Sequence, residues 1–400
     1  MTRRVLIIAA LAAACLPWTA LAQDLPWSEV VARARGETVN WNAWAGDDKT
    51  NAFIAWVAGE VRGRFGITLN HVKLKDTSEA VTRVVAEKAA GRLAGGTVDL
   101  IWLNGPNFLA LKEQGLLYGP FAQRLPNFRY VDTVHKRSTV VDFTIPVDGF
   151  AAPWRMAQLV FVYDGARVRS PPTSMSGMLE WAKKNPGRLT HPQVRNFLGA
   201  TFLKQALLEL APNAVVLQQP ATDGNFSAAT APMWAWYDAL RPNLWRQGRQ
   251  FPENGPAQRQ LLNDGEVDFL VSFNPAEAAV SVRAGLLPDS VRTLVFARGT
   301  IGNTSFVAIP FNAANKESAM VVADFLLEPA TQAYAQDIEH LGSVTVLDVE
   351  RLPAADRRRF AELSGLPAMP RDTQLGTMLL EPHPSWMTRM AAEWERRYTR

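Results

Sequence analysis

Two apolar segments that lie far apart in the chain have nearly the same pattern of residues. The first is 98–104, VDLIWLN, and the second is 267–274, VDFLVSFN; each follows a glycine-bearing turn and ends in Asn shortly before a proline. Such a continuous apolar run is typical of a strand buried on both faces of a parallel sheet. Because ligands of open α/β sheets bind at the carboxyl ends of strands, we expect Asn104 and Asn274 to face one cleft from two similar lobes.

Strand-like and helix-like patterns alternate through the first third of the chain. Thr38–Trp44 and the alternating run 67–74 predict strands, and each is followed by a helical stripe of apolar residues. The first helix is expected to begin near Thr50, and the second follows a helix-start signal at 76–79. A third helix is expected at 106–114. This alternation predicts an α/β fold with a doubly wound sheet.

Two extended passages, 140–163 and 291–310, interrupt this alternation. The first contains Pro153 within extended chain, which suits a crossing between lobes better than a central strand. Length also favours two domains, because single cores stop growing beyond about 250–300 residues. We therefore predict a signal peptide at 1–22, the first part of lobe 1 at 23–153, lobe 2 at 154–298, and the second part of lobe 1, with C-terminal helices, at 299–400.

The N-terminus has the pattern of a secretory signal peptide. Arg3 and Arg4 precede the apolar run 5–14, which is too short to span a bilayer, and residues 20–22 supply a small-x-small cleavage site. We expect cleavage after Ala22 and a soluble product in the periplasm, because no later run reaches the ~20 apolar residues of a transmembrane helix. Cys15 is the only cysteine and leaves a lipoprotein as the alternative. Cleavage after Ala22 would leave no thiol for disulfides or metal binding.

Composition and charge exclude some partners. The chain has 400 residues, of which 48% are hydrophobic and 20% charged, so it is globular and not disordered. Loss of residues 1–22 removes two arginines and no acid, so the formal charge falls from +4 to +2. That small charge gives no reason to expect nucleic acid as a partner. The 13 tryptophans are more informative, because Trp at strand ends supplies flat apolar walls to a binding cleft.

Short catalytic motifs are absent from the sequence. There is no Gly-x-Ser-x-Gly, no His-Glu-x-x-His and no Gly-x-x-x-x-Gly-Lys-[Ser/Thr] loop, and the five histidines are scattered without metal-ligand spacing. We therefore expect no enzyme activity, no cofactor and no metal. A secreted hydrolase that uses a carboxylate pair stays open as an alternative, because carboxylates abound in the chain. A soluble ligand sensor on the same fold is a second alternative.

Several segments along the mature chain together form a recognisable set. They are Thr38–Trp44, 99–108, 113–117, 153–163, 265–268, 306–310 and the helical run 319–327 with 328–332 after it. With the export signal, this set resembles a bacterial extracellular solute-binding protein of an ABC importer, of the type II periplasmic-binding fold. Residues 40–44, 71–91 and 104–118 are similar to the YnjB-type branch.

The resemblance implies both an architecture and a function. Each lobe is expected to be a mixed, mostly parallel sheet flanked by helices, with a cleft between the lobes that closes on its ligand by hinge bending. The protein is expected to be a monomer that captures a small solute and delivers it to an inner-membrane ABC permease with its ATPase. The resemblance does not identify the solute.

Candidate ligand-binding residues lie at strand ends, at helix starts and in the crossings. They are Trp41, Trp44, Asp47, Asn104, Gly105, Asn107, Trp154, Arg155, Asn196, Phe273, Asn274, Asn303 and Thr304. The alternatives are core packing for the tryptophans and turn chemistry for the asparagines. Asp99 and Asp268 begin their strands, far from the ligand-binding end, and are interpreted as structural.

The type of solute stays open at this point. Arg155 favours an anionic group if it faces the cleft, whereas the tryptophans favour a ring or an apolar face. Thiamine-like, polyamine-like and sugar ligands are all compatible with the sequence. The six tyrosines are isolated from one another, which argues against the adjacent tyrosines of a bare iron site.

Overall fold

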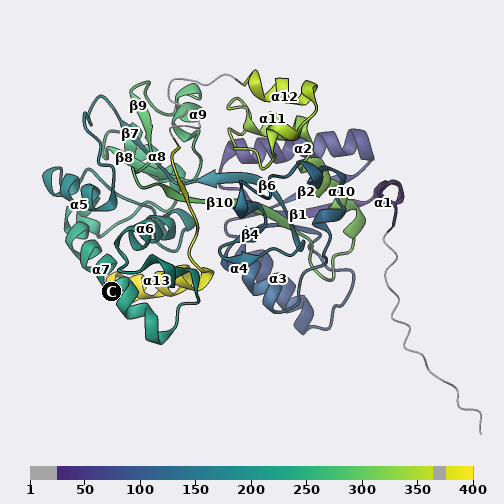
Figure 1. Cartoon of the computed structure of the whole chain (residues 1–400), viewed down its shortest axis with the longest axis horizontal. Helices are drawn as coiled ribbons and strands as arrows, with labels where there is room; N and C mark the ends of the chain where they lie inside the picture. Colours follow the sequence, from purple (N-terminus) through teal and green to yellow (C-terminus); the bar gives the residue numbers. More distant parts are fainter. Residues whose placement is uncertain (1–24, 364–374, 400) are drawn as a thin grey trace, which may run out of the picture.

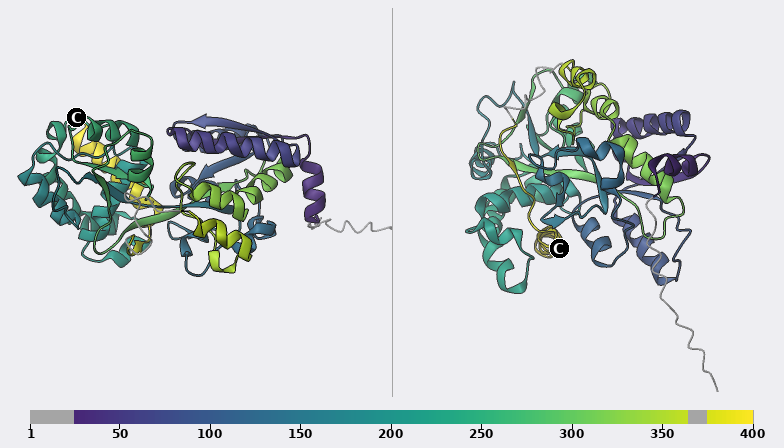
Figure 2. Two further views of the ribbon diagram at one scale, coloured as in Figure 1. Left: turned by 90° about the horizontal axis from the view of Figure 1, so that it is seen from above. Right: turned by 45° about the vertical axis from the view of Figure 1, so that its right-hand side comes forward.

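The computed structural model describes residues 25–363 and 375–399, which form two lobes side by side (Figure 1). Each lobe has its own large apolar core, one built around Trp41 and Trp154 and the other around Phe202 and Trp386. Extended chain joins the lobes, as the view from above shows (Figure 2). The predicted two-lobed α/β fold is confirmed.

The first lobe is built on a six-stranded mixed sheet. Its strands are β1 (Thr38–Trp44), β2 (Thr68–Leu74), β3 (Leu100–Leu103), β6 (Ala151–Gln158), β10 (Thr300–Ala308) and β11 (Met378–Leu379). The order is β11-β10-β3-β1-β2, with β6 paired to β10 outside this path. β1 runs parallel to β2 and β3, whereas β10 runs antiparallel to β3 and β6.

Helices cover both faces of the first-lobe sheet, as the alternating pattern predicts. They are α1 (Trp27–Ala34), α2 (Asp48–Phe65), α3 (Ser78–Ala89), α4 (Pro106–Glu113), α10 (Lys316–Leu326), α11 (Pro329–Gln336) and α12 (Ala354–Ala361). The core on one face contains α1, α2 and α10, and a separate core on the other face contains α3 and α4. A short hairpin of β4 (Val141–Asp142) and β5 (Ile145–Pro146) is held to the start of α4 through Asp142.

The second lobe has a smaller sheet in which both strand pairs are antiparallel. Its strands are β7 (Val160–Asp164), β8 (Phe269–Ser272) and β9 (Val291–Leu294), in the order β8-β7-β9. The prediction of a mostly parallel sheet is therefore wrong for this lobe. β8, the strand of the second twin segment, is buried along its whole length. Burial on both faces requires an apolar run whether the neighbouring strands are parallel or antiparallel, so the run did not reveal the direction of the strand. The helices are α5 (Met175–Lys184), α6 (Phe197–Leu210), α7 (Asp223–Leu240), α8 (Gly255–Asn263), α9 (Glu277–Arg283) and α13 (Pro384–Tyr398).

Capping side chains determine where the helices next to the lobe boundary begin. Asp47 accepts a hydrogen bond from the Thr50 amide (2.8 Å), so α2 starts at Asp48, slightly before the predicted position. Asn196 accepts from the Leu198 amide (3.0 Å) at the start of α6. Each cap satisfies an amide that the first helical turn leaves without a partner.

Two passages of described chain connect the lobes, and a third, residues 375–383, lies beside them where the lobes meet. β6 leads directly into β7, and β10 returns beside β6 as its antiparallel partner, which accounts for the two predicted crossings. In the third passage, β11 pairs with the start of β10 and the chain continues to α13. The Gln158 side chain ties all three together, because its Nε2 donates to Thr300 Oγ1 (3.1 Å) and to the carbonyl of Leu375 (2.9 Å).

This third passage corrects the predicted domain assignment. α13 packs on α6 of the second lobe and also contacts α4 of the first (Figure 1). Its side chains Trp386, Met390 and Trp394 are buried in the second core. The reason is the apolar face of α13, which the second core covers. α12 does stay in the first lobe, through Phe360. Trp154, which we assigned to lobe 2, packs in the first core. The signal-peptide prediction for 1–22 lies outside the described residues.

Candidate functional site

A cavity of about 280 Å³ lies between the two lobes. The first lobe contributes residues at or just after the ends of β1, β2 and β3, and the second lobe contributes the end of β8 and the starts of α6 and α8. This is the edge at which the strand-end rule places a ligand. The volume is close to the lower end of the range for small-molecule sites, about 300–1,000 Å³.

Nine of the thirteen candidate residues line this cavity. They are Trp44, Asp47, Asn104, Asn107, Arg155, Asn196, Phe273, Asn274 and Asn303. Asn104 follows β3 in the first lobe and Asn274 follows β8 in the second, so the two twin segments do bring their last residues to one cavity. Asn303 is already engaged, because its Nδ2 donates to Glu381 Oε1 (2.9 Å).

Trp41 and Trp154 do not line the cavity, contrary to our prediction. Their rings pack edge to face with centroids 5.9 Å apart, and Trp154 also stacks on Phe53 of α2. Both side chains are almost completely buried in the first core. The reason is the two-residue period of a strand: Trp41 and Trp44 are three residues apart on β1, so their side chains point to opposite faces.

Gly105 and Thr304 are also placed outside the cavity lining. The Thr304 hydroxyl makes a buried hydrogen bond with Ser138 Oγ (2.9 Å). The Gly105 amide donates to Asp142 Oδ2 (2.6 Å), and its φ of +55° is one that side chains disfavour. A Cβ at Gly105 would lie 3.1 Å from the Phe143 ring. Backbone conformation and packing therefore explain this glycine.

The first turns of four helices border the cavity. Asn107 belongs to α4, Phe197 to α6, Gly255 to α8 and Thr50 to α2. The residue before the first helical position is uncharged in α4, α6 and α8, where it is Gly105, Asn196 and Asn254, whereas α2 has Asp47 there. The N-terminus of a helix carries a partial positive charge and free amide groups. The carboxylate of Asp47 opposes that charge only at α2.

Arg155 is the buried cation of the cavity wall. The residue is 9% exposed, and its Nε has no hydrogen-bond partner among the described residues. The guanidinium lies 5.6 Å from the ring centre of Trp102 and 5.5 Å from that of Trp154. Burial lowers the pKa of Arg155 to about 10, although the negative charge of Asp47 acts in the opposite direction. The side chain therefore remains charged at neutral pH.

Sequence reasoning missed several residues of the cavity lining. Trp102 lies two residues before Asn104, so the two-residue period of a strand places both side chains on the same face and would have identified Trp102. Arg259 lies one helical turn after Gly255, and it forms an ion pair with Glu277 (Nη1–Oε1 3.0 Å). No short-range signal connects Arg259 with Glu277, because they belong to different helices. None of the described residues that line the cavity is Tyr or His.

A buried charged network lies next to the cavity, where the lobes meet. Lys204 of α6 donates to Glu381 Oε2 (2.6 Å), and both side chains are at most 2% exposed. The Lys204 ammonium also lies 4.8 Å from the ring centre of Phe197, a cavity residue. Burial lowers the pKa of Lys204 and raises that of Glu381. Burial also raises the pKa of Asp142 well above its usual range, and the negative charge of Glu381 acts in the same direction.

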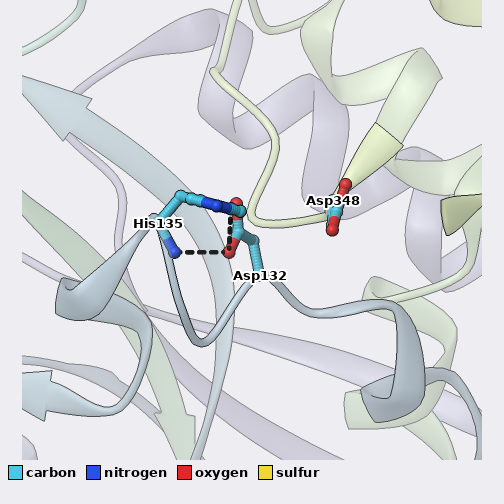
Figure 3. Close-up of side chains that lie close together, drawn as sticks. All are labelled: Asp132, His135 and Asp348. Carbon is cyan, nitrogen blue, oxygen red and sulfur yellow. Dashed lines mark hydrogen bonds and ion pairs between the residues drawn. The ribbon is translucent and has the colours of Figure 1, made fainter. Parts of the chain in front are cut away.

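Outside the cavity, Asp132, His135 and Asp348 bring possible metal-ligand atoms within 4.8 Å of one another (Figure 3). Hydrogen bonds within the turns explain this group. Asp132 Oδ1 accepts from the amides of Val134 (3.1 Å) and His135 (2.8 Å), and Asp348 Oδ1 accepts from the Glu350 amide (3.2 Å). We interpret these carboxylates as turn caps.

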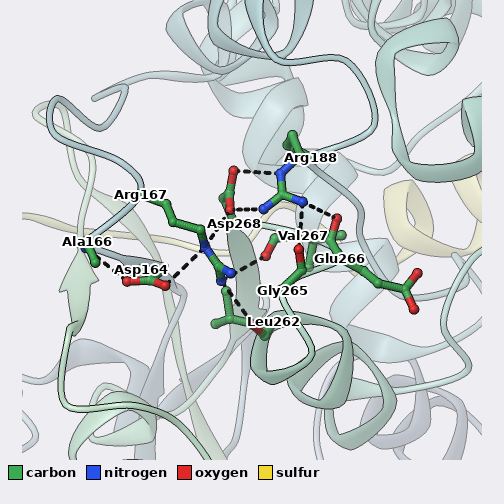
Figure 4. A network of polar contacts seen from close by, with 9 residues as sticks. All are labelled: Asp164, Ala166, Arg167, Arg188, Leu262, Gly265, Glu266, Val267 and Asp268. Atoms are coloured by element: carbon green, nitrogen blue, oxygen red, sulfur yellow. Dashed lines mark hydrogen bonds and ion pairs between the residues drawn. The ribbon is translucent and has the colours of Figure 1, made fainter.

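The aspartates that begin the twin segments have structural roles, as the sequence predicts. Asp99 accepts from the backbone amides of Asn40 (2.9 Å) and Asn315 (3.0 Å). Asp268 lies between Arg167 (Nε–Oδ1 2.9 Å) and Arg188 (Nε–Oδ2 3.0 Å) (Figure 4). Both networks fix the strand end that lies away from the cavity.

Comparison with known proteins identifies the family. Residues 56–349 match the model of the bacterial extracellular solute-binding protein family. The chain belongs to this family. A curated relative of this solute-binding protein is Protein YnjB of Escherichia coli (strain K12), which is 41% identical over 372 residues, covering 93% of this chain and 94% of the relative.

Solved structures with the same fold are much more distant in sequence. A putative spermidine/putrescine ABC transporter protein from Listeria monocytogenes has a TM-score of 0.64 at 15% identity, covering 90% of this solute-binding protein and 98% of that chain. The periplasmic binding protein AfuA from Actinobacillus pleuropneumoniae, solved with fructose-6-phosphate, has a TM-score of 0.63 at 14% identity, covering 91% and 99%. These similarities confirm the type II periplasmic-binding fold.

The family assignment establishes the general role. This chain is the solute-binding component of an ABC transport system, a class of extracellular proteins that bind a small solute for delivery to a permease. Members of the family are transport proteins and not enzymes. In the described residues, no helix is both long enough and apolar enough to cross a membrane.

Proposed function

We propose that the cavity between the lobes is the solute site, and that Trp44, Asn104 and Asn107 of the first lobe and Phe273 and Asn274 of the second bind the solute together. The observation that carries this proposal is that both lobes line one cavity with the ends of corresponding strands. The remaining lining residues among our candidates, Asp47, Arg155, Asn196 and Asn303, complete the proposed site.

Binding is coupled to closure of the lobes in this proposal. A solute favours the closed state only if it contacts both lobes at once, and the cavity offers contacts from both. The lobes already touch outside the cavity lining, where Arg283 of α9 in the second lobe pairs with Glu339 of the first (Nε–Oε1 2.8 Å). The Arg283–Glu339 ion pair is exposed, so it adds little stability without solute.

The cellular part of the proposal follows from the family and the N-terminal sequence. The chain is exported to the periplasm, cleaved after Ala22 and active as a monomer. It delivers its solute to an inner-membrane ABC permease that is driven by an ATPase. A lipid anchor on Cys15 is the competing outcome, and mass spectrometry of the mature N-terminus distinguishes the two.

A retention experiment tests the site. Purified protein is unfolded, refolded and incubated with a heat-treated extract of bacterial metabolites, and compounds that remain after gel filtration are identified by mass spectrometry. The wild type is expected to retain a small molecule that the Trp44→Ala/Asn104→Ala double variant does not retain. The matched control is Trp27→Ala/Asn70→Ala, which removes the same residue types outside the cavity. Equal retention by wild type and cavity variant, or no retention by the wild type, contradicts the proposal.

A further inference from the structure

Arg155 is a buried cation that lines the cavity between the lobes, and its Nε has no hydrogen-bond partner in the described part of the chain. We propose that the solute is a small organic anion whose carboxylate or phosphate group binds Arg155 and whose flat or apolar part lies between Trp44 and Phe273. This inference rests on the proposed solute site and adds the chemical class of the solute.

The energetic argument begins with the cost of an unpaired buried charge. Burial of a guanidinium without a carboxylate is unfavourable, and only hydrogen-bonded ion pairing recovers the lost hydration. The contacts with Trp102 and Trp154 stabilise the cation only in part. A carboxylate or phosphate has the planar or tripodal set of oxygens that a guanidinium binds with two parallel hydrogen bonds. An anionic solute therefore supplies the missing partner.

The acidic residues of the cavity wall are already engaged, which argues against a cationic solute. Asp47 accepts from the amide of Thr50 (2.8 Å) as the cap of α2. Asp76 Oδ1 accepts from the Ser78 amide (2.8 Å), and Glu277 pairs with Arg259 (3.0 Å). Of the described residues that line the cavity, these are the only acids. A polyamine or thiamine would have to compete for carboxylates that the fold already uses, whereas an anion would not.

Helix dipoles add to the same preference. The first turns of α4, α6 and α8 open on the cavity, and none of the three has a charged capping residue. α4 has no side-chain cap of its own. The amide of Gly105 donates to Asp142 and Pro106 has no amide hydrogen, so Asn107 has the first amide of this helix that can donate to a solute. Partial positive charge from both lobes therefore surrounds the solute, and each such terminus contributes a favourable interaction with an anion.

Aromatic side chains on the two lobes define the other part of the solute. Trp44 packs edge to face with Trp102 (6.3 Å between centroids) in the first lobe. Phe273 packs edge to face with Phe197 (5.4 Å) in the second lobe, and all four residues line the cavity. Aromatic edges and faces of this kind bind rings and apolar groups. An inorganic anion alone would leave these surfaces in contact with water, so an organic anion fits better.

Arg155→Met tests this inference, with Arg62→Met as a control that removes the same charge from an exposed position of α2. The retention experiment above is repeated with both variants, and the charge of the retained compound is read from its identity. Thermal melts are also recorded with citrate, fructose 6-phosphate, inorganic phosphate, fructose and putrescine at matched ionic strength. Citrate distinguishes a carboxylate ligand from a phosphate ligand, and fructose and putrescine test neutral and cationic solutes.

Three results are expected. The compound retained by the wild type is an anion, and Arg155→Met binds anions about ten- to a hundredfold more weakly, the range for loss of a hydrogen bond to a charged group. At least one anion raises the melting temperature of the wild type and of Arg62→Met, but not of Arg155→Met. Without ligand, Arg155→Met melts at a higher temperature than the wild type, because an unpaired buried charge is gone.

Each contrary result has a definite meaning. A retained cation or neutral compound that needs Trp44 and Asn104 overturns the anionic assignment but leaves the proposed solute site intact. A lower melting temperature of ligand-free Arg155→Met indicates a structural role for Arg155 and overturns the assignment. The assignment also fails if anions raise the melting temperature of this variant and of the wild type equally, or if no anion raises the melting temperature of the wild type. If the wild type retains nothing, both proposals fail.

Discussion

Loss of one partner of the buried Lys204–Glu381 ion pair should destabilise the protein strongly, whereas loss of both should not. The pair joins α6 of the second lobe to the third passage, and neither side chain reaches solvent. The change we consider is Glu381→Gln, Lys204→Met and the double variant. Gln and Met have nearly the same size as the residues they replace, so the comparison concerns charge and not volume.

The magnitude follows from what each single variant leaves behind. Glu381→Gln leaves a buried ammonium that still contacts the rings of Phe143 (4.5 Å) and Phe197 (4.8 Å) and lies near the carboxyl group of Asp142. Breaking a buried pair costs about 3–5 kcal/mol, and these contacts place the expected loss near 3 kcal/mol. Lys204→Met leaves Glu381 with only the Asn303 amide as donor. The double variant buries no charge, so its free energy of unfolding should fall by about 1 kcal/mol or less.

Urea unfolding of residues 23–400, followed by far-UV circular dichroism, measures these losses at pH 7. The matched control is the Lys183–Glu180 pair of α5, which also lies in the second lobe but is about half exposed on each side chain (48% and 62%). Its variants Glu180→Gln and Lys183→Met should change stability by less than about 0.5 kcal/mol. The reasoning is refuted if the double variant loses as much as the two single variants together, or if the single variants behave like the exposed control.

Three further predictions concern residues around the same boundary and the second core. Asp142→Asn should be nearly neutral because its oxygen still accepts from the Gly105 amide, whereas Asp142→Leu should lose about 1–3 kcal/mol in urea unfolding. Gly105→Ala should cost about 1–3 kcal/mol and weaken solute retention, because φ is +55° and the new Cβ meets Phe143. Burial lowers the pKa of His191 to about 4, so the folded protein favours the neutral imidazole. The contribution of neutral His191 to stability is complete above the ordinary pKa of 6.5 and is lost as the pH falls toward 4. Stability should therefore drop by roughly 2 kcal/mol between pH 7 and pH 5, and His191→Gln, which cannot gain the proton, should show a smaller drop in urea unfolding at the two pH values.

Local patterns in the sequence predicted which strand ends line the cavity between the lobes, because the relevant rule is local. The carboxyl end of a strand, where ligands bind, can be recognised in the sequence as the point where an apolar run gives way to a polar residue. Asn104 and Asn274 were found in this way, although 169 residues lie between them in the sequence. The same reasoning misplaced Trp41, although the two-residue period of β1 already showed that Trp41 and Trp44 point to opposite faces.

Other features depend on contacts that no local pattern reveals. Lys204 and Glu381 are 177 residues apart, and each would be expected at the surface by residue type alone. The antiparallel direction of β8 could not be inferred, because burial on both faces produces the same apolar run in either orientation. The sequence predicted C-terminal helices in the first lobe, but both lobes offer a core on which α13 could pack, and only the path of the third passage decides between them.

Gln158 has a consequence for how the two lobes can separate. Its side chain binds both neighbouring passages, so three lengths of described chain are fixed beside one another where the lobes meet. A band of three chains bends across its width but resists rotation about its length. Opening should therefore follow one axis, and Asn104 and Asn274 should move apart without sliding past each other. A solute that enters the open form would then meet the two walls already in register, which favours rapid capture over a search among misaligned states.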